Sequence, residues 1–302
     1  METKERLYND PDAGNVVLRK SARCRRIVLK VHPVRGISVS IPVYMRYRDG
    51  LQFYLRKRDW VLSVLKRQKE QAGAAEKDGR AVSLTGDGAM VHTLLSEIVF
   101  IRDTGCREQA HGKVSVRVTS SIVEDVKSSG RLFLSLDMPV TRKEIRYPDS
   151  LPPEGSEELR VALSGVLVKV LRDEARSLLP AKLSCLAERY GIAYAAVAVK
   201  HNSTNWGSCS TLGNINLNLN LVRLPEPVCD YVLLHELSHI RYHDHGREFH
   251  DTLERMCGDN LRRLSSLGEP CSAALLAKAA RSRAMRPYSH VLEMAVKGYR
   301  LV

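Results

Sequence analysis

The spacing of hydrophobic positions changes along the chain, from alternation in the first half to helical repeats in the second. Residues 26–31 and 37–41 carry an apolar side chain at every second position, and Gly36 lies between them. Such alternation is typical of strands with one buried face, so the two segments predict a β-hairpin that ends at Pro42. Residues 1–15 are polar and predict a loose lead-in. Similar patterns predict further strands, over 98–103, 114–119 and 131–136.

Apolar residues at helical spacing predict three helices, over 50–71, 156–179 and 180–190. Ser156 would cap the second helix, and Pro180 would separate it from the third. Gly191 would end the third helix. Residues 72–86 are small and polar and predict a loop.

Two strands are predicted around a glycine-bearing turn, over 195–200 and 215–221. The second strand alternates Ile and Leu with Asn216, Asn218 and Asn220. Alternation places the aliphatic side chains on the core face and the asparagines on the other face. The asparagines would either line a substrate cleft or face water, and the pattern leaves both readings open.

The stretch 231–240 contains His-Glu-x-x-His within an apolar run that is compatible with a helix. His235 and His239 are four residues apart, so on a helix they share one face and can bind one ion. Glu236 projects into the same site, where it can act as a base on a water molecule without being a ligand. We therefore predict one Zn²⁺ ion with Glu236 as the catalytic residue.

A catalytic zinc held by two histidines needs a third protein ligand, and His245 is the best candidate. It lies ten residues after the first histidine, where Gly246 predicts a turn back over the site. His243 competes for this role, and His250 is a weaker candidate. Residues 247–257 predict a second helix, closed by Gly258.

A cleft wall is predicted beside the metal, from Trp206, Gly207 and Ser208 together with Asn216 and Asn218. Oxyanion donors cannot be assigned from the pattern, which leaves Tyr231, Tyr242 and His201 as candidates. Cys209 is more typical of an inert thiol than of a nucleophile.

The composition, with 44% hydrophobic and 27% charged residues, fits a soluble globular protein. Apolar runs stay short of the roughly 18 residues that a membrane span needs, so we expect no membrane partner. The charged start, 1–6, has no apolar region behind it, unlike a secretory signal. Seven cysteines, an odd number, fit free thiols. These features favour a cytoplasmic protein.

The net charge of +13 is unevenly placed, with fourteen Lys or Arg against two acids between Arg19 and Arg67. Residues 272–302 add six more against Glu293 alone. Such charge indicates either a solvated face or attraction to phosphates. Nucleic acid is therefore a candidate partner of the basic segments 19–67 and 272–302.

The motifs together resemble the YgjP-like metallopeptidase family of predicted metal-dependent hydrolases, which is related to SprT-like zinc peptidases. The resemblance rests on 206–210, 214–218, Leu224-Pro225 and 231–239, completed by His245 and Phe249. It implies an α+β fold with a zincin-like core, in which the metal-binding helix packs beside a mixed sheet. It also implies zinc at His235, His239 and His245, with Glu236 as base. Gly246 and His250 depart from the family's usual serine and tryptophan.

The expected domain spans 16–270, with a β-rich half over 16–149, a metal-site half over 155–270, and a basic tail over 271–302. The expected function is a zinc-dependent hydrolase, foremost a metallopeptidase acting on a polypeptide. A small-molecule substrate stays open. The alternatives are a nucleotide phosphoanhydride hydrolase and a nucleic-acid-associated, SprT-like protease.

Overall fold

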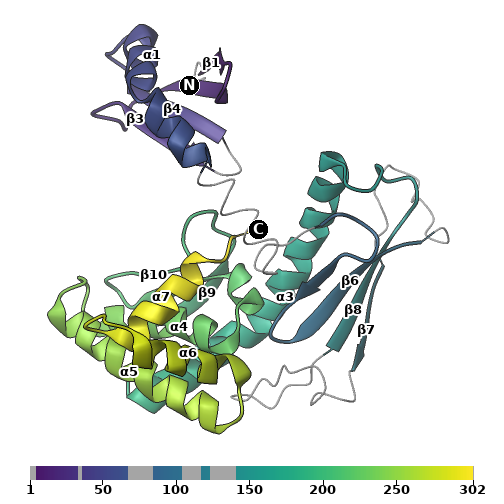
Figure 1. The fold of residues 1–302 in the computed structure, drawn as a ribbon, viewed down its shortest axis with the longest axis vertical. Coiled ribbons are helices and arrows are strands. Elements are labelled where there is room, and N and C mark those ends of the chain that lie inside the picture. The colour runs from purple at the N-terminus through teal and green to yellow at the C-terminus, as the bar shows by residue number, and fades with distance from the viewer. Residues whose placement is uncertain (1–4, 33–35, 67–83, 104–116, 123–140, 302) are drawn as a thin grey trace. The chain divides into compact units, whose positions relative to one another are not determined.

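A computed structural model describes residues 5–32, 36–66, 84–103, 117–122 and 141–301 (Figure 1). The chain forms two compact units, Met1–Gly79 and Arg80–Val302. Both combine helices with mixed sheets, so the fold is α+β as expected. The division between the units differs from the expected domain over 16–270, because each unit builds its own hydrophobic core. Among the described helices, none has the length and apolar character to cross a membrane.

The first unit is a four-stranded mixed sheet with strand order β1-β2-β4-β3. Its strands and its first helix are β1 (Glu5–Asp10), β2 (Gly14–Ser21), β3 (Val28–His32), β4 (Gly36–Pro42) and α1 (Tyr47–Arg56). Residues 58–66 continue as helix after a turn at Lys57, and the rest of the expected helix, 67–71, lies outside the described residues. The expected hairpin is confirmed, with Leu29 opposite Val39.

The loose lead-in expected over 1–15 is wrong for its described part, because β1 and the start of β2 form a hairpin there. Asp10 makes the turn: its Oδ1 accepts hydrogen bonds from the N–H groups of Asp12 and Ala13, both at 3.0 Å. Gly14 follows with φ 77°, a conformation that glycine adopts without strain. The pattern missed β1 because an edge strand with mostly exposed side chains has little apolar alternation.

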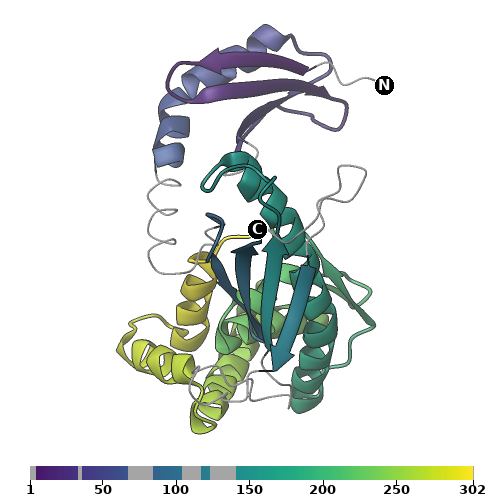
Figure 2. The ribbon, with the colours of Figure 1, turned by 90° about the vertical axis from the view of Figure 1, so that its right-hand side faces the viewer.

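The second unit contains a sheet with strand order β5-β6-β8-β7 that packs against the long helix α3 (Figure 2). Its elements are β5 (Met90–His92), β6 (Ser96–Arg102), β7 (Arg117–Ile122), β8 (Thr141–Tyr147) and α3 (Glu157–Tyr190). The strand expected over 98–103 is confirmed in β6, whereas the one over 131–136 lies outside the described residues. The strand over 114–119 corresponds in part to β7.

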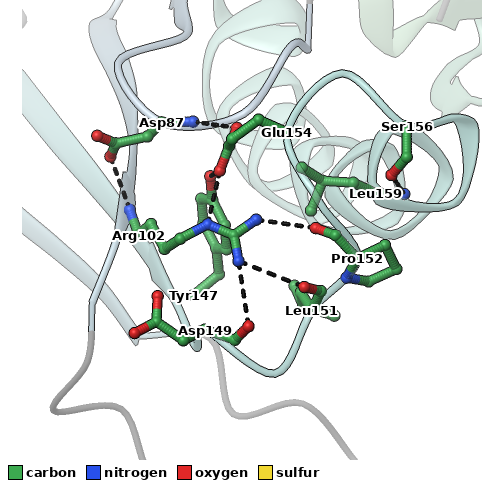
Figure 3. A network of polar contacts seen from close by, with 9 residues as sticks. All are labelled: Asp87, Arg102, Tyr147, Asp149, Leu151, Pro152, Glu154, Ser156 and Leu159. Carbon is green, nitrogen blue, oxygen red and sulfur yellow. Dashed lines mark hydrogen bonds and ion pairs between the residues drawn. The ribbon is translucent and has the colours of Figure 1, made fainter.

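Arg102, at the end of β6, fixes the chain where it enters α3 (Figure 3). Its Nε donates to Glu154 Oε1 at 2.6 Å, and its Nη2 donates to the carbonyl of Pro152 at 2.8 Å. Glu154 also accepts from the hydroxyl of Tyr147 at 3.0 Å and from the N–H of Asp87 at 2.8 Å. One carboxylate and one guanidinium thus join two strand ends to the segment before the helix.

The two helices expected on either side of Pro180 are one continuous helix, α3. A proline inside a helix costs about 3 kcal/mol. Leu183 and Leu186, which follow it, are buried, and each buried leucine contributes about 1.5–3 kcal/mol. Continuing the helix therefore offsets the cost of the proline. Ser156 caps it as expected, accepting from Leu159 N–H at 3.2 Å.

A second, three-stranded sheet has strand order β10-β11-β9, and its elements are β9 (Ala196–Lys200), β10 (Gly207–Cys209) and β11 (Asn214–Asn218). The strand expected over 215–221 ends early, because the Asn218 side chain accepts from Asn220 N–H at 3.0 Å. That bond turns the chain into a 3-10 helix, η1 (Leu219–Arg223). Leu219 and Leu221 are still buried, so the apolar alternation there reflects a helical turn.

Four helices complete the second unit in the described part of the chain: α4 (Glu226–Arg241), α5 (Arg247–Ser266), α6 (Pro270–Arg281) and α7 (Pro287–Lys297). Gly258 does not close α5, contrary to expectation. A Cβ at this position would lie 2.8 Å from Cδ2 of Tyr288 on α7, so the glycine makes room for a packed ring. The segment expected as a tail, 271–302, consists largely of α6 and α7.

Glu254 of α5 holds the start of α7, where its carboxylate accepts from the N–H groups of Tyr288 at 2.9 Å and Ser289 at 2.8 Å. Arg286 adds an ion pair to Asp251 at 2.8 Å. A carboxylate at a helix N-terminus satisfies free N–H groups and complements the helix dipole. The start of α7 is therefore fixed to α5 by specific polar contacts.

Candidate metal centre

The His-Glu-x-x-His motif lies in the second half of α4, as the apolar run predicted. The surrounding residues Leu233, Leu234 and Leu237 are buried, so the helix is anchored by its apolar face. His235 and His239 are half-buried, and their ring centroids are 4.9 Å apart. The helix ends at Arg241, and the chain then turns back through 242–246 toward α5.

His245, in this turn, joins the other two histidines. Its Nε2 lies 3.3 Å from Nε2 of His235. One donor atom from each of the three side chains lies within 4.8 Å of the others. Two nitrogens bound to a tetrahedral zinc at about 2.0–2.1 Å are themselves about 3.3 Å apart. The donor set therefore fits one zinc ion.

The orientation of His239 is set by the carbonyl of Tyr242, which lies 3.1 Å from its Nδ1. A ring nitrogen beside a carbonyl carries the proton, which leaves Nε2 of this ring free as a ligand. Phe249 of α5 packs against all three imidazoles, with ring centroids 4.6–5.0 Å away. This phenylalanine is fully buried, so it is a fixed support for the three rings.

The electrostatics of the histidines favour the neutral form that metal ligands need. Burial, together with the nearby His239 and His245, lowers the pKa of His235 to about 4. Burial also lowers the pKa of His239. Neutral imidazoles present a lone pair, so proton release does not oppose metal binding near neutral pH.

Glu236 lies next to the three histidines and faces a cavity of about 400 Å³. The side chain is buried, and its Oε2 has no hydrogen-bond partner within the part of the chain that the structure describes. Burial raises the pKa of Glu236 to about 7. A buried carboxylate oxygen without a hydrogen-bond partner destabilises the fold, so it is typical of a functional group rather than a structural one. Accepting a proton is one such function.

Gly207 of β10 lies directly against Glu236. A Cβ on this glycine would lie 2.6 Å from Glu236 Oε1 and 2.8 Å from Glu236 Cγ. Real Cβ atoms are not found at such distances, so any other residue would displace the carboxylate. The sequence placed Gly207 in the cleft wall but did not indicate this contact.

The strand β10 forms an edge of its sheet, since it pairs only with β11 among the described strands. Hydrogen bonds join Trp206 to Asn218 at 2.8 Å and Ser210 to Asn214 at 2.9 Å. Hydrogen-bonded pairs alternate along an antiparallel ladder, so Gly207 and Cys209 direct their main-chain N–H and C=O groups away from β11. Both residues line the cavity.

The structure divides the five residues expected in the cleft wall. Gly207 and Ser208 line the cavity, whereas Trp206, Asn216 and Asn218 do not. Asn216 donates to Ser208 Oγ at 3.3 Å and so contacts the wall from behind. Asn218 is buried, and its amide donates to the carbonyls of residues 202 and 205 at 2.7 and 2.9 Å. These two hydrogen bonds fix the position of the segment that leads to β10.

The competing histidines lie apart from the three donor groups. His243 lines the cavity, and the His250 ring centroid is 6.1 Å from that of His245. Tyr231 is buried one turn before His235, with its ring centroid 6.1 Å away. Burial and the charge of Glu236 raise the pKa of the Cys209 thiol, which disfavours a thiolate nucleophile.

Glu293 of α7 contributes to the electrostatics of the site, which the sequence did not indicate. Its charge raises the pKa of His235, against the lowering by burial, and it also acts on Tyr231. No local pattern marks this residue, because its proximity to the site arises from the packing of α7 against α4.

Residues 141–269 match the YgjP-like metallopeptidase domain. This match confirms the resemblance that the motifs carried. The YgjP-like segment runs from β8 to just beyond α5 and contains all three histidines and Glu236. It ends before α6 and does not include the first unit, so it is shorter than the expected domain over 16–270. Among curated proteins and among solved structures, nothing matches the chain. The YgjP-like domain indicates an enzyme, a metal-dependent hydrolase.

Proposed function

We propose that the protein is a zinc-dependent metallopeptidase in which His235, His239 and His245 bind one zinc ion. The observation that carries this proposal is the convergence of the three donor atoms beside the buried, unpaired oxygen of Glu236. Three imidazoles with an open cavity are typical of a catalytic zinc, because a structural zinc has four protein ligands. The arrangement also supports a zincin-like core, with α4 packed beside β10.

Zinc at this site would polarise a substrate carbonyl and lower the pKa of a water molecule to about 7. Glu236 would take the proton from that water as the water oxygen bonds to the carbonyl carbon, because Oε2 of Glu236 has no competing partner in the described residues. Gly207 has no side chain that would displace the Glu236 carboxylate, and Phe249 packs against the imidazoles and holds them in position. Glu236 then returns the proton to the leaving amine as the bond to the carbonyl carbon breaks.

The edge of β10 favours a polypeptide as substrate. The main-chain groups of Gly207 and Cys209 face away from β11 and can pair with an extended peptide. Such pairing recognises the backbone rather than particular side chains. It would place a peptide bond across the cavity next to Glu236, so we expect unfolded polypeptides to be better substrates than folded ones.

The cavity offers less support for nucleotide hydrolysis. Among the described residues that line it there is no lysine or arginine, only small residues, histidines and Glu236. A triphosphate needs cations beyond a single metal ion to balance its charge. The phosphoanhydride alternative therefore has no observation at the site in its favour, and the SprT-like alternative depends on a nucleic-acid surface elsewhere.

The test is incubation of zinc-loaded protein with an unfolded protein substrate and, separately, with a panel of nucleoside triphosphates. We expect peptide cleavage that stops on chelation and returns with zinc. The Glu236→Gln variant serves as the matched control for contaminating proteases. Phosphate release without peptide cleavage would overturn the proposal in favour of the nucleotide alternative, and no metal-dependent cleavage of varied polypeptides would also overturn it.

A further inference from the structure

The described part of the first unit has a cluster of arginines at one end of its sheet. β2 and β4 are parallel to each other, and β1 and β3 run opposite to them. The ends of β2 and β4 therefore meet the starts of β1 and β3, and α1 begins at the same end. Six exposed arginines lie in these starts and connections, here called the arginine end: Arg6, Arg23, Arg25, Arg26, Arg46 and Arg48.

At the opposite end of the sheet, the described residues include one arginine that is paired with two acids. There the Arg58 guanidinium donates to Asp10 at 2.7 and 2.9 Å and also contacts Asp12. Asp10 is buried, and the hydroxyl of Tyr54 donates to it at 2.9 Å. Arg58 is thus committed to holding the fold.

The arginine end has no such compensation. Within the described residues, no ion pair joins any of its six arginines to an acid. Among the described residues, the nearby acids are Glu5, opposite Arg19 in the sheet, and Asp49, whose carboxylate accepts from the N–H of Arg46 at 2.9 Å. Guanidinium groups without acidic partners are suited to phosphate, which they bind through paired N–H donors.

Tyr44 adds an aromatic surface at the same end. Its side chain is 74% exposed, yet its hydroxyl donates to the carbonyl of Arg25 at 2.8 Å. The ring is therefore held in place while its surface stays open. Beside it, Lys20 donates to the carbonyl of Val43 at 2.9 Å, and its ammonium lies 5.4 Å from the ring centroid of Tyr47. These contacts fix the two connections that carry Arg23, Arg25 and Tyr44.

We propose that the arginine end of the first unit is a binding surface for single-stranded nucleic acid. Arginines bind the phosphates, and the fixed, exposed Tyr44 ring stacks on an unpaired base. A duplex hides its base faces, so charge alone would attract it and the ring would contribute little. This function is independent of the metal site, whose residues all lie in the second unit.

The test uses the full-length protein and a fluorescent oligonucleotide of about 20 nucleotides, longer than the roughly 4–16 nucleotides of known single-strand sites. Binding is measured by anisotropy and compared with a duplex of the same sequence. We expect tighter binding to the single strand. For about five phosphate contacts, affinity should fall about 100-fold between 50 and 200 mM salt.

Charge placement is tested with two variants that each remove two positive charges. Arg25→Gln with Arg26→Gln should weaken binding about tenfold or more, whereas Arg56→Gln with Lys57→Gln, at the other end of α1, should change it less than about twofold. Equal losses in the two variants would overturn the assigned surface. Undetectable binding at 50 mM salt, or binding to anionic vesicles alone, would overturn the proposal itself.

The role of Tyr44 is tested by comparing Tyr44→Ala with Tyr44→Phe. Stacking predicts a loss of about fivefold to a hundredfold for alanine and little loss for phenylalanine, which keeps the ring. If both variants lose binding equally, the hydroxyl contact to Arg25 matters instead of the ring, and stacking is excluded. If neither loses binding and the duplex binds as tightly, the proposal of a single-strand site is wrong.

Discussion

The groups around the candidate metal centre differ in their expected roles, and each role determines the effect that a substitution should have. Glu236 contributes a buried carboxylate with one unpaired oxygen, while His239 and His245 contribute donor nitrogens that meet His235. A base and a ligand are separable by experiment, because only loss of a ligand should remove the metal.

Glu236→Gln should keep zinc and lose activity. The amide preserves the size of the side chain but cannot accept a proton, which costs on the order of 10²–10⁴ in rate. The measurement is zinc per chain by elemental analysis beside a peptide cleavage assay. Loss of zinc from a folded Glu236→Gln protein would show that the carboxylate is a ligand.

His239→Ala and His245→Ala should each lose most of the zinc together with activity. His243→Ala is the matched control, because His243 lines the cavity without joining the three donor atoms. The same elemental analysis applies. Zinc loss in His243→Ala but not in His245→Ala would reverse the assignment of the third ligand.

Gly207→Ala should reduce activity by about 10²-fold, the loss expected when a catalytic group is displaced by about 1 Å. The added methyl group would contact the Glu236 side chain and displace it, whereas the histidines lie on other elements and should keep zinc. Leu212→Ala, in the exposed turn after the strand and outside the residues that line the cavity, serves as the control. Unchanged activity in Gly207→Ala would mean that the carboxylate position tolerates movement.

The cluster of three histidines could be predicted largely from sequence, because a helix fixes the relation of His235 to His239 by its periodicity alone. His245 required only a turn close behind that helix. Asn218 could not be assigned in this way: its alternation suggested an outward face, but its amide is buried and bonded to the segment before β10. Glu293 was missed because only tertiary packing brings α7 to the site.

At the scale of the helices, a buried ion network joins α3 and α5 to the first half of α4. Lys182 of α3 lies 2.6 Å from Glu226 and 2.8 Å from Asp230, both on α4. Asn260 of α5 donates to Asp230 at 2.8 Å. All four side chains are buried, so their contacts are shielded from water. The network therefore fixes the start of the helix that carries the histidines.

Lys182→Met should destabilise the second unit by about 3–5 kcal/mol, because it leaves two acids buried without their cation. Lys169→Met is the control, an exposed lysine on the same helix. Chemical unfolding followed by circular dichroism measures the difference. Equal free energies of unfolding for the two variants would show that the buried network adds nothing to stability.

The element boundaries that sequence missed share one cause. Pro180 and Gly258 are residues that usually end helices, yet tertiary contacts keep the chain helical at both places. Buried leucines follow the proline, and the glycine receives the ring of Tyr288. The intrinsic preference of a residue ends a helix only where tertiary packing does not favour its continuation. A local sequence pattern does not indicate packing partners that are distant in the sequence.

At the scale of the whole molecule, the two units have separate hydrophobic cores. We expect two unfolding transitions. Zinc should raise the midpoint temperature of the second unit's transition only, because a ligand stabilises the fold that binds it. Differential scanning calorimetry with and without zinc measures both transitions. A single transition that shifts as a whole would show that the units unfold together.

Asp10→Asn should lower the stability of the first unit in a pH-dependent way. The Arg58 guanidinium holds the pKa of the Asp10 carboxyl far below its usual value of about 3.9. The charged form therefore stabilises the fold above about pH 4, by about 1.5–3 kcal/mol for a charged hydrogen bond, and this contribution is lost as pH falls toward the folded-state pKa. Unfolding at pH 6 and at pH 3 should therefore show a difference from the wild type that is smaller, but still present, at pH 3.

The packing of the Tyr288 ring against Gly258 has a consequence for how the two residues should vary in evolution. The family-matched segment ends at residue 269, before the helix that carries this ring, so the glycine inside α5 serves a neighbour outside that segment. A lineage without α7 gains helix stability, about 1 kcal/mol, by replacing the glycine with alanine. A lineage with α7 cannot make this change while the ring is seated there. Glycine at 258 and an aromatic residue at 288 should therefore have been inherited, and lost, as a pair.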